Sequence, residues 1–408
     1  MLTRRFGLQA SALLFGAASA FAQQKRPAAG GHAAAGHRGK DAADIPGGNP
    51  AGTPLGTVDT AAKWAYIQDY DTGAKLLEKQ ADDEMPPSSM TKLMTLYLVY
   101  DQLKQGRLKL TDELPVSEKA WHMQGSKMFV QLGGMVKVED LIRGVVVQSG
   151  NDAAIVLAEA IGGSEEQFAE KMNAKAKELG LTHSVFKNCT GWPDPDQHMS
   201  CRDIAALASD IIRDFPDYYH YDSEKTFRYN GIEQGNRNPM VQKGTADGLK
   251  TGHTEAGGYG LVASSKRNGR RVVLVLNGMD SMHERAEEAE RLMDWAFFNF
   301  EDVTLFSGGD VIENVPVWLG TSHAVPLVAG RDVTVTMPRN WRQKAAVKLS
   351  YDAPLTAPVA KGDMLGKLTV SGDGVPHLDV PLMAGADVPR LGLPGRAIAV
   401  LSKYVTGT

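Results

Sequence analysis

The chain has 408 residues, 43% of them apolar and 23% charged, and a net charge of −4 at neutral pH. This length allows two domains with large cores, and the composition is that of a folded globular protein. The small negative charge points to neither nucleic acid nor an anionic surface as a partner. With only two cysteines, the fold does not depend on a disulfide framework.

Residues 1–22 have the pattern of a secretory signal peptide. Arg4 and Arg5 give a positive start, a mostly apolar run follows, and Ala20-Phe21-Ala22 is a cleavage pattern. A short membrane anchor is disfavoured because the apolar run is too short to span a bilayer comfortably. The paired arginines leave the twin-arginine route open. We therefore predict an exported, periplasmic protein, with a peripheral place on the inner membrane as the open alternative.

Residues 23–56 are rich in Ala, Gly, Pro and His, so we expect a disordered linker. Its histidines, His32 and His37, are not expected to bind a metal. Folded structure is predicted from about Lys63. It should begin with a hairpin, whose strands over 65–70 and 74–78 flank the turn Asp71-Thr72-Gly73.

The stretch over residues 85–98 combines a helix start with two reactive side chains. Two prolines favour an extended entry, and Ser88 or Ser89 follows them as a natural N-cap. Residues 90–100 are apolar on nearly every face of a 3.6-residue repeat, which is typical of a buried helix. We therefore predict a central helix with Ser89 and Lys92 in its first turn.

Ser89 and Lys92 are three residues apart and so share one face of this helix. Ser89 becomes a nucleophile only when a base takes its proton. Lys92 can be that base only if burial or a second cation lowers its pKa. The free N–H groups of a helix start would stabilise an oxyanion beside the serine. Alternatively Ser89 only caps the helix and Lys92 is a solvated lysine, and this motif alone does not decide.

Helical patterns continue through the middle of the chain. An apolar run over 138–147 predicts a helix, which is interrupted at 148–152. Ser164 and Ser200 are caps for two of the helices that follow. These helices are predicted over residues 152–161, 165–179 and 201–213.

Residues 227–242 are expected to form a loop. Three strands and a closing helix should follow, over residues 247–252, 259–265, 271–279 and 285–300. Two strands, a block of helices and then three strands with a helix predict one sheet flanked by helices from both ends of the chain.

From Val303 onward, short β runs punctuated by Gly and Pro replace the helical patterns, which predicts a small all-β domain. Its strands are expected over residues 315–319, 332–337, 346–351, 364–370 and 378–382. Residues 392–408 should form a short amphipathic helix. The predicted division is a signal peptide, a linker, a mixed domain, an all-β domain and a tail, over residues 1–22, 23–56, 57–301, 302–388 and 389–408.

Three short motifs stand in order along the chain: Ser89-Met90-Thr91-Lys92, Ser149-Gly150-Asn151 and Lys250-Thr251-Gly252. Each is weak alone, but each lies where its role requires, at a buried helix start, at a break between helices and on a strand. Together they are the set found in penicillin-recognising serine enzymes. The chain resembles that family, and within it the low-molecular-mass D-alanyl-D-alanine carboxypeptidases.

The likeness runs over residues 63–382 and includes the hairpin turn, the segment 247–254 and Arg285 with Trp295. It implies an α/β (α+β) catalytic domain like that of penicillin-binding proteins and β-lactamases, with an antiparallel sheet flanked by helices, and a small all-β domain. The implied activity removes the terminal D-alanine from peptidoglycan pentapeptides. β-Lactam antibiotics would be covalent inhibitors, and no cofactor, metal or nucleic acid is implied.

The resemblance also implies roles for the site residues. Ser89 is the nucleophile that forms an acyl-enzyme, Lys92 is its general base, and Ser149 relays protons toward the leaving group. Asn151 holds the amide of the substrate. Lys250 is a cation that helps to keep Lys92 deprotonated and attracts the anionic substrate.

Thr251 and Arg285 are implied to bind the terminal carboxylate, and the backbone N–H groups of Ser89 and His253 to form the oxyanion hole. Only the backbone of His253 is needed for this role. The implied substrate-binding set is Asn151, Lys250, Thr251, Gly252, His253 and Arg285.

Simpler roles stay open for some of these residues. Arg285 has Glu288 and Asp280 nearby in sequence and could form a salt bridge at a helix start. Ser149 and Asn151 could cap the following helix.

Three other functions are alternatives. A β-lactamase is disfavoured because the E-x-x-L-N pattern of class A enzymes is missing: Leu276-Asn277 is preceded by Val273 and not by Glu. A D,D-endopeptidase is disfavoured by the β domain after Val303. A non-catalytic cell-wall binding protein is disfavoured because all three motifs are intact.

Two features depart from the family pattern. Cys189 and Cys201 are close in sequence in a chain predicted to be exported, so we predict a disulfide, with two buried free thiols as the alternative. The amphipathic tail is shorter than is usual in the family. It offers one narrow apolar stripe, which predicts only weak contact with a membrane.

Overall fold

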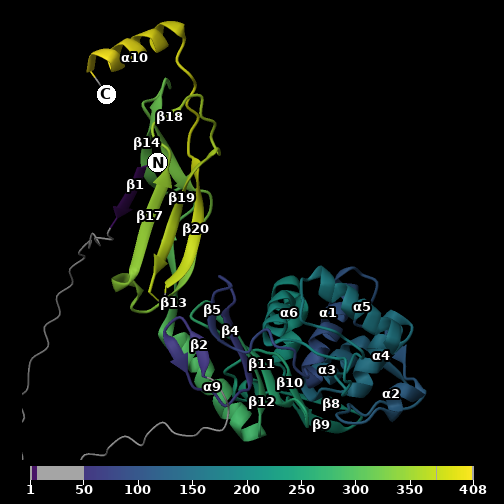
Figure 1. Cartoon of the computed structure of the whole chain (residues 1–408). Helices are drawn as coiled ribbons and strands as arrows, with labels where there is room; N and C mark the ends of the chain where they lie inside the picture. Colours follow the sequence, from purple (N-terminus) through teal and green to yellow (C-terminus); the bar gives the residue numbers. More distant parts are fainter. Residues whose placement is uncertain (1, 7–49, 374, 407–408) are drawn as a thin grey trace, which may run out of the picture.

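The computed structural model of the protein describes residues 2–6, 50–373 and 375–406. A helix-rich domain carries α1–α9, an elongated β domain follows it, and α10 lies at the far end (Figure 1). Leu2–Phe6 form β1, which pairs with a strand of the β domain. The remainder of the predicted signal peptide and residues 23–49 of the predicted linker lie outside the described residues.

The first domain is built on an antiparallel sheet in the order β10-β11-β12-β4-β5-β2-β3. The predicted hairpin is confirmed as β4 (Trp64–Asp69) and β5 (Lys75–Lys79), and two of the three later strands as β11 (Gly258–Arg267) and β12 (Arg270–Met279). The strand predicted over residues 247–252 is displaced, because β10 spans Thr251–Thr254 and shares only its first two residues with that prediction.

The fold begins earlier than Lys63. Two short strands, β2 (Ala51–Thr53) and β3 (Gly56–Val58), extend the sheet beyond β5, where Gly52 pairs with Glu78. Residues 50–56 of the predicted linker are therefore ordered. The composition gave no sign of these two strands, because each has only three small residues and only Ala51 is fully buried.

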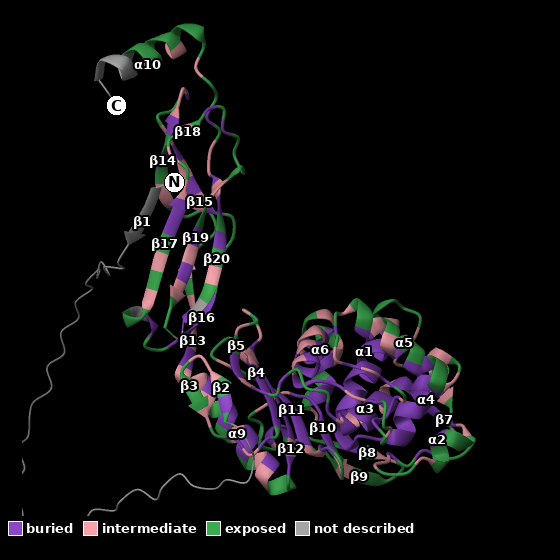
Figure 2. Cartoon of the chain, viewed as in Figure 1, coloured by how far each residue is buried: buried purple, intermediate pink, exposed green. Residues whose placement is uncertain are grey.

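Both faces of the sheet are covered (Figure 2). Alternate side chains of β12 enter different cores: Val273 and Val275 pack with the large helical block, and Leu274 and Leu276 pack with α9. This explains why the strand is apolar without a break from Val272 to Leu276 and does not alternate with polar residues there. The helical block consists mainly of α1, α3, α4, α5 and α6, with bounds Lys92–Lys104, Val138–Gln148, Asn151–Gly162, Glu165–Glu178 and Cys201–Asp214.

The helix caps were predicted with mixed success. Ser164 Oγ accepts a hydrogen bond from Gln167 N, and Ser200 Oγ accepts one from Asp203 N, as expected. The N-cap role of Ser88 or Ser89 is wrong, because both lie inside a 3₁₀ turn, η1 (Ser88–Thr91), that leads into α1 without a side-chain cap.

The segment 227–242 is not a loop. It contains a hairpin and a short helix, β8 (Thr226–Tyr229), β9 (Ile232–Gly235) and α8 (Pro239–Lys243). Its strands have only four residues each, too short for a clear alternating pattern. The closing helix α9 spans Met282–Asn299. Small elements that the sequence did not predict are β6, β7, α2, α7 and η2, over Glu113–Pro115, Met135–Lys137, Glu118–His122, Pro216–Tyr219 and His220–Ser223.

The second domain is all β, as predicted, and has its own apolar core. β13 pairs with β16 where the chain leaves α9, and a larger sheet has the order β1-β17-β19-β20-β15-β14-β18. The strands β13 to β20 span Phe300–Phe306, Val311–Trp318, Ala324–Ala329, Val333–Pro338, Ala345–Tyr351, Leu355–Thr356, Met364–Gly372 and Val375–Ala384. The amphipathic tail forms α10 (Leu393–Thr406).

The predicted disulfide is absent. Cys189 and Cys201 are buried free thiols with separate neighbours. Cys189 Sγ lies 3.3 Å from Glu165 Oε1, whereas Cys201 Sγ lies 3.9 Å from Met85 Sδ. The prediction failed because closeness in sequence does not place two side chains together: Cys189 lies within the loop between α5 and α6, against Glu165, and Cys201 begins α6.

A buried arginine joins the sheet to the start of the β domain. Arg270 Nε donates to Asp69 Oδ2 at 2.9 Å and to Asp302 Oδ1 at 3.2 Å. Arg270 Nη1 donates to the carbonyls of Ala296 and Phe300. Because Asp69 is fully buried, its charge depends on this partner.

We predict that Arg270→Ala lowers the free energy of unfolding by about 3–5 kcal/mol, because it leaves the Asp69 carboxylate buried without a cation. Urea unfolding would measure the loss. Lys75→Ala is the control, since it breaks an exposed pair with Glu78 and should cost less than about 1 kcal/mol. Equal losses in the two variants would contradict the importance of the buried pair.

Candidate active site

The predicted nucleophile and base meet at the start of the central helix. Ser89 lies in η1 and Lys92 is the first residue of α1, so one turn of chain brings both side chains to the same side. Lys92 is fully buried, whereas Ser89 borders a cavity. A lysine in this position loses the water that would stabilise its charge.

Three oxygens surround the amino group of Lys92. Its Nζ lies 3.0 Å from Ser89 Oγ, 2.6 Å from Asn151 Oδ1 and 2.5 Å from the carbonyl oxygen of Thr190. Amide and carbonyl oxygens can only accept hydrogen bonds, and a neutral lysine has two N–H donors and one lone pair. With both donors used on Asn151 and Thr190, the lone pair is directed at the hydroxyl of Ser89.

The electrostatics favour that neutral form. Burial, with a smaller contribution from the positive charge of Arg237, lowers the pKa of Lys92 to about 7. The pKa of Lys250 is also lowered well below its usual value, first by burial and then by Lys92, Arg237 and Arg285. Burial therefore disfavours the positive charge predicted for Lys250. An anion that enters the site would favour the charged form again.

The second motif forms a tight break between α3 and α4. Ser149 ends α3 in the left-handed region, with φ of 62°. Its Oγ is buried and has no hydrogen-bond partner among the described residues, and the residue lines the cavity. Ser149 is therefore free to bond a ligand and does not cap α4, so the simpler role considered for it is not observed.

The side chain of Asn151 uses most of its hydrogen-bonding groups within the protein. Its Oδ1 accepts from Lys92, and its Nδ2 donates to the carbonyl of Gln124 at 2.7 Å. Only its second amide N–H remains for the substrate contact predicted for it. The neighbouring Asp152 carboxylate accepts from the backbone N–H groups of Met128, Phe129 and Val130, which fixes the adjoining loop as one wall of the cavity.

The third motif lies on β10, the edge strand of the sheet. Lys250 and Val262 exchange both backbone hydrogen bonds. In an antiparallel pair, successive residues bond alternately toward the partner strand and away from it. The backbone of Gly252 therefore bonds to β11, and the N–H of His253 points to the free edge of the sheet. That edge lies against η1: a Cβ on Gly252 would come within 3.1 Å of the carbonyl oxygen of Pro87. The N–H of His253 is thus available beside the nucleophile.

Two arginines border the cavity without a carboxylate partner among the described residues. Arg285 is 7% exposed, its Nη2 donates only a long hydrogen bond of 3.5 Å to the carbonyl of Arg237, and its Nε has no partner. Arg237 Nε donates to the carbonyl of Gln148. The salt bridge considered for Arg285 is therefore not formed, and Glu288 pairs with Arg291 instead.

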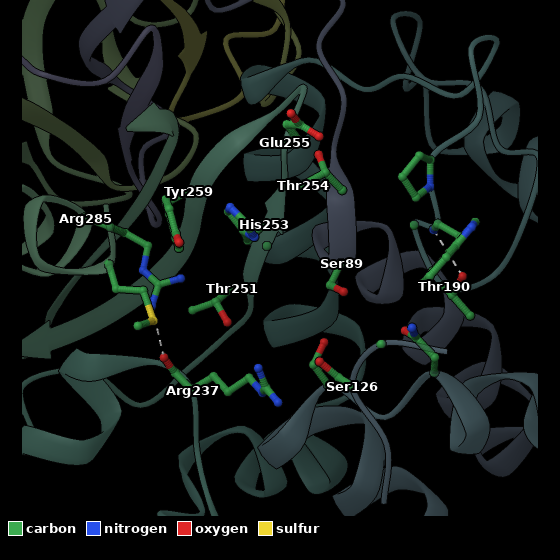
Figure 3. Close-up of a pocket in the computed structure, with 18 residues that line it drawn as sticks. Ser89, Ser126, Thr190, Arg237, Thr251, His253, Thr254, Glu255, Tyr259 and Arg285 are labelled. Carbon is green, nitrogen blue, oxygen red and sulfur yellow. Dashed lines mark hydrogen bonds between the residues drawn. The ribbon is translucent and has the colours of Figure 1, made fainter. Parts of the chain in front are cut away.

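The motifs meet in one cavity of about 690 Å³ (Figure 3). Ser89 lies at its centre, with Arg237, Thr251 and Arg285 to one side. Among the residues predicted to form the site, the structure brings Ser89, Ser149, Asn151, Thr251, Gly252, His253 and Arg285 to the lining, and it places Lys92 and Lys250 just beneath.

Sequence reasoning missed several lining residues. Arg237 lies in the segment expected to be a loop, and Tyr259, whose ring stacks on His253 at a centroid distance of 3.9 Å, was treated only as part of a strand. Ser126 and Trp192 were not identified either. Arg237 carries no local signal, because only the fold brings the short segment between β9 and α8 against the end of α3 at the cavity.

A serine hydroxyl against the amino group of a buried lysine, with free backbone donors and unpaired cations in the same cleft, defines a serine acyl-transfer enzyme with a lysine base. A family model described as D-alanyl-D-alanine carboxypeptidase matches residues 51–281, and one described as the C-terminal domain of penicillin-binding protein 5 matches residues 300–390. The chain therefore belongs to the D-alanyl-D-alanine carboxypeptidase family. The family, fold class and activity predicted from the motifs are confirmed.

The relatives span most of the chain. The D-alanyl-D-alanine carboxypeptidase DacA of Haemophilus influenzae is 39% identical over 344 residues, 82% of this chain and 87% of that protein. The structure of penicillin-binding protein 5 from the same organism has a TM-score of 0.73 and 37% identity, over 82% of this chain and 99% of that one. The structure of penicillin-binding protein D2 from Listeria monocytogenes, in an ampicillin-bound form, has a TM-score of 0.55 and 26% identity, over 59% of this chain and 99% of that one.

We predict that Asn151→Asp moves the pH dependence of catalysis upward. A carboxylate beside Lys92 favours its charged form and raises its pKa by about one to three units. Because only neutral Lys92 can accept the Ser89 proton, the rising limb of kcat/KM for D-alanine release should shift from a midpoint of about 7 by the same amount.

Asn268→Asp serves as the control, because it adds the same charge at an exposed turn between β11 and β12. Its profile should match that of the unmodified protein. A midpoint that stays in place in Asn151→Asp would show that Lys92 is not the titrating base.

Proposed function

We propose that this enzyme removes the terminal D-alanine from peptidoglycan stem peptides through an acyl-enzyme on Ser89. The observation that carries the proposal is the contact of 3.0 Å between Ser89 Oγ and Lys92 Nζ, because burial lowers the pKa of this lysine to about 7 and its neutral form can take the hydroxyl proton. Ser89 Oγ bonds to the carbonyl carbon of the penultimate residue while its proton passes to Lys92. The carbonyl oxygen becomes an oxyanion.

The backbone N–H groups of Ser89 and His253 are the proposed donors to this oxyanion. Ser89 is the second residue of a 3₁₀ turn, where N–H groups have no acceptor within the turn, and the N–H of His253 lies at the free edge of β10. When the intermediate collapses, the C–N bond breaks and D-alanine leaves. The proton held by Lys92 reaches the leaving amine through Ser149, whose hydroxyl is unpartnered.

Water completes the cycle. It attacks the ester on Ser89, gives a proton to Lys92 and releases the shortened peptide, while Ser89 Oγ takes the proton back. A β-lactam would acylate Ser89 in the same way. The ampicillin-bound Listeria relative supports this proposal. The leaving nitrogen of a β-lactam stays tethered to the acyl group, so the ester should persist longer.

The terminal carboxylate of the substrate is proposed to bind to Thr251 and Arg285, with Arg237 beside them. Both arginines lack an anionic partner among the described residues, and a carboxylate can accept bidentate bonds from a guanidinium. Lys250 lies beneath this end of the cavity. A bound carboxylate would favour the charged form of Lys250 and so offset the effect of burial on its pKa.

We further propose that the protein is exported to the periplasm by the signal peptide at residues 1–22, and that residues 57–301 and 302–388 act as catalytic and β domains. Among the described residues, the helices lack the combination of length and apolar character that would carry one across a bilayer. Leu393, Ile398 and Leu401 of α10 are exposed, and this narrow apolar stripe supports weak contact with a membrane.

Ser89→Ala should abolish both D-alanine release and covalent labelling by benzylpenicillin, because it removes the hydroxyl that lies 3.0 Å from Lys92 Nζ at the border of the cavity. D-Alanine release from an acyl-D-Ala-D-Ala peptide and intact-mass measurement of the protein test the two effects. Rapid hydrolysis of penicillin with no D-alanine release by the unmodified protein would favour a β-lactamase instead. Cleavage of internal D,D-peptide cross-links in preference to terminal D-alanine would favour a D,D-endopeptidase.

Arg285→Ala should lower kcat/KM on D-Ala-D-Ala peptides by about tenfold to hundredfold, because it removes a charge-assisted hydrogen bond of about 1.5–3 kcal/mol. Ester substrates without a terminal carboxylate should lose much less. Arg228→Ala, which breaks an exposed pair with Glu233, is the matched control and should change neither. An equal loss on peptide and ester would contradict the carboxylate role.

A further inference from the structure

A second cavity, of about 430 Å³, adjoins the catalytic cavity and belongs to none of the three motifs. The two cavities share Gly191, Trp192, Pro193 and Thr254. In Figure 3, Thr190 lies on the side of Ser89 away from Arg285, and Thr254 lies above Ser89. The second cavity therefore extends the cleft past the nucleophile, between Thr254 and the loop that follows Thr190, and neither arginine of the first cavity lines it.

The walls of this second cavity are held together by side-chain and backbone contacts. Ser88 Oγ lies 2.9 Å from Thr254 Oγ1, which ties η1 to β10 between the two cavities. Gly191 has a φ of 79°, and a Cβ there would overlap the carbonyl of Ser88, so the loop and η1 are in direct backbone contact. Met85 exchanges both backbone hydrogen bonds with Met199 below. The cavity is thus formed before any ligand binds.

The charges that line the two cavities are opposite in sign. Glu84 and Asp194 line the second cavity, which has no lysine or arginine among its lining residues, and Glu255 lies at the shared end of the first. Glu84 has only an exposed contact with His198 at 3.5 Å. Asp194 Oδ1 accepts from the N–H of Asp196. The cleft is therefore cationic on one side of Ser89 and anionic on the other.

The polar and apolar groups of the second cavity also suit a peptide. Trp192 exposes 43% of its surface and, with Pro86 and Pro193, offers flat apolar walls. The buried Gln197 accepts from the N–H groups of Lys187 and Asn188 through its Oε1, so its NH₂ group is the part left to bond a peptide carbonyl.

A substrate that places its terminal carboxylate at the arginines and its scissile carbonyl at Ser89 must extend its acyl side away from the arginines. We propose that the second cavity is the subsite for that acyl side, and that Glu84 and Asp194, with Glu255 at its entrance, select a peptide carrying a side-chain ammonium group there. The inference rests on the proposed function, and it adds a specificity that the three motifs do not supply. A peptide with a negative end and a positive side chain matches the charge order of the cleft.

The test uses two peptides that differ in one charge: a lysine residue followed by D-Ala-D-Ala, with its side-chain amine free or acetylated. The unmodified full-length enzyme should release D-alanine from the free-amine peptide with a kcat/KM about threefold to tenfold higher, the range expected for two partly exposed ion pairs. This preference should shrink as salt is added.

Glu84→Gln and Asp194→Asn, made singly and together, should reduce the ratio of the two kcat/KM values toward one. Asn at position 194 can keep the hydrogen bond to Asp196 N, so the turn is preserved. Glu178→Gln is the control, because it removes an exposed carboxylate that lines neither cavity and should leave the ratio unchanged.

Two results would overturn the proposal alone: turnover of both peptides at the same rate by the unmodified enzyme, or an equal loss on both peptides in the Glu84 and Asp194 variants. Failure of the unmodified enzyme to release D-alanine from either peptide would overturn the proposed function, and the subsite with it.

Discussion

The burial of Lys92 is the constraint on which the site depends. An amino group without access to water cannot keep its charge cheaply, and it must still have hydrogen-bond partners for its polar atoms. Asn151 Oδ1 and the carbonyl of Thr190 supply two of them, and Ser89 Oγ is the third. The same packing that forms the core of α1 therefore converts a lysine into a base.

These partners also explain the surrounding architecture. Asn151 can reach Lys92 because the chain breaks between α3 and α4, with Ser149 in a left-handed conformation. The carbonyl of Thr190 comes from the loop before α6, and Thr95 of α1 donates to the carbonyl of Cys189 in that loop. Segments that are distant in sequence are thus fixed around one amino group.

Charge is distributed unevenly around this centre. The site gathers four basic side chains, those of Lys92, Lys250, Arg237 and Arg285, and burial already disfavours the charged forms of the two lysines. No carboxylate among the described residues pairs with either arginine. Such a site is incomplete without an anion. We propose that the terminal carboxylate of the substrate supplies this anion, so that its binding would also adjust the pKa values of the two lysines.

Sequence reasoning found the parts that depend on local pattern. The hairpin of β4 and β5, the capped helices and the three motifs are each encoded in a few neighbouring residues. It failed where only the tertiary fold decides. Arg237 reaches the cleft because its backbone and side chain bond to the end of α3, Cys189 and Cys201 pack against different neighbours, and β2 is stabilised by pairing with β5.

The central claim is tested most directly by measuring the pKa of Lys92 in the folded protein. NMR of lysines labelled at the side-chain nitrogen would follow each amine against pH, with the Lys92 signal assigned by its loss in Lys92→Arg. The account predicts a titration with a midpoint of about 7. A Lys92 amine that stays charged up to the ordinary lysine range near ~10.4 would contradict it, because Ser89 would then have no base at neutral pH.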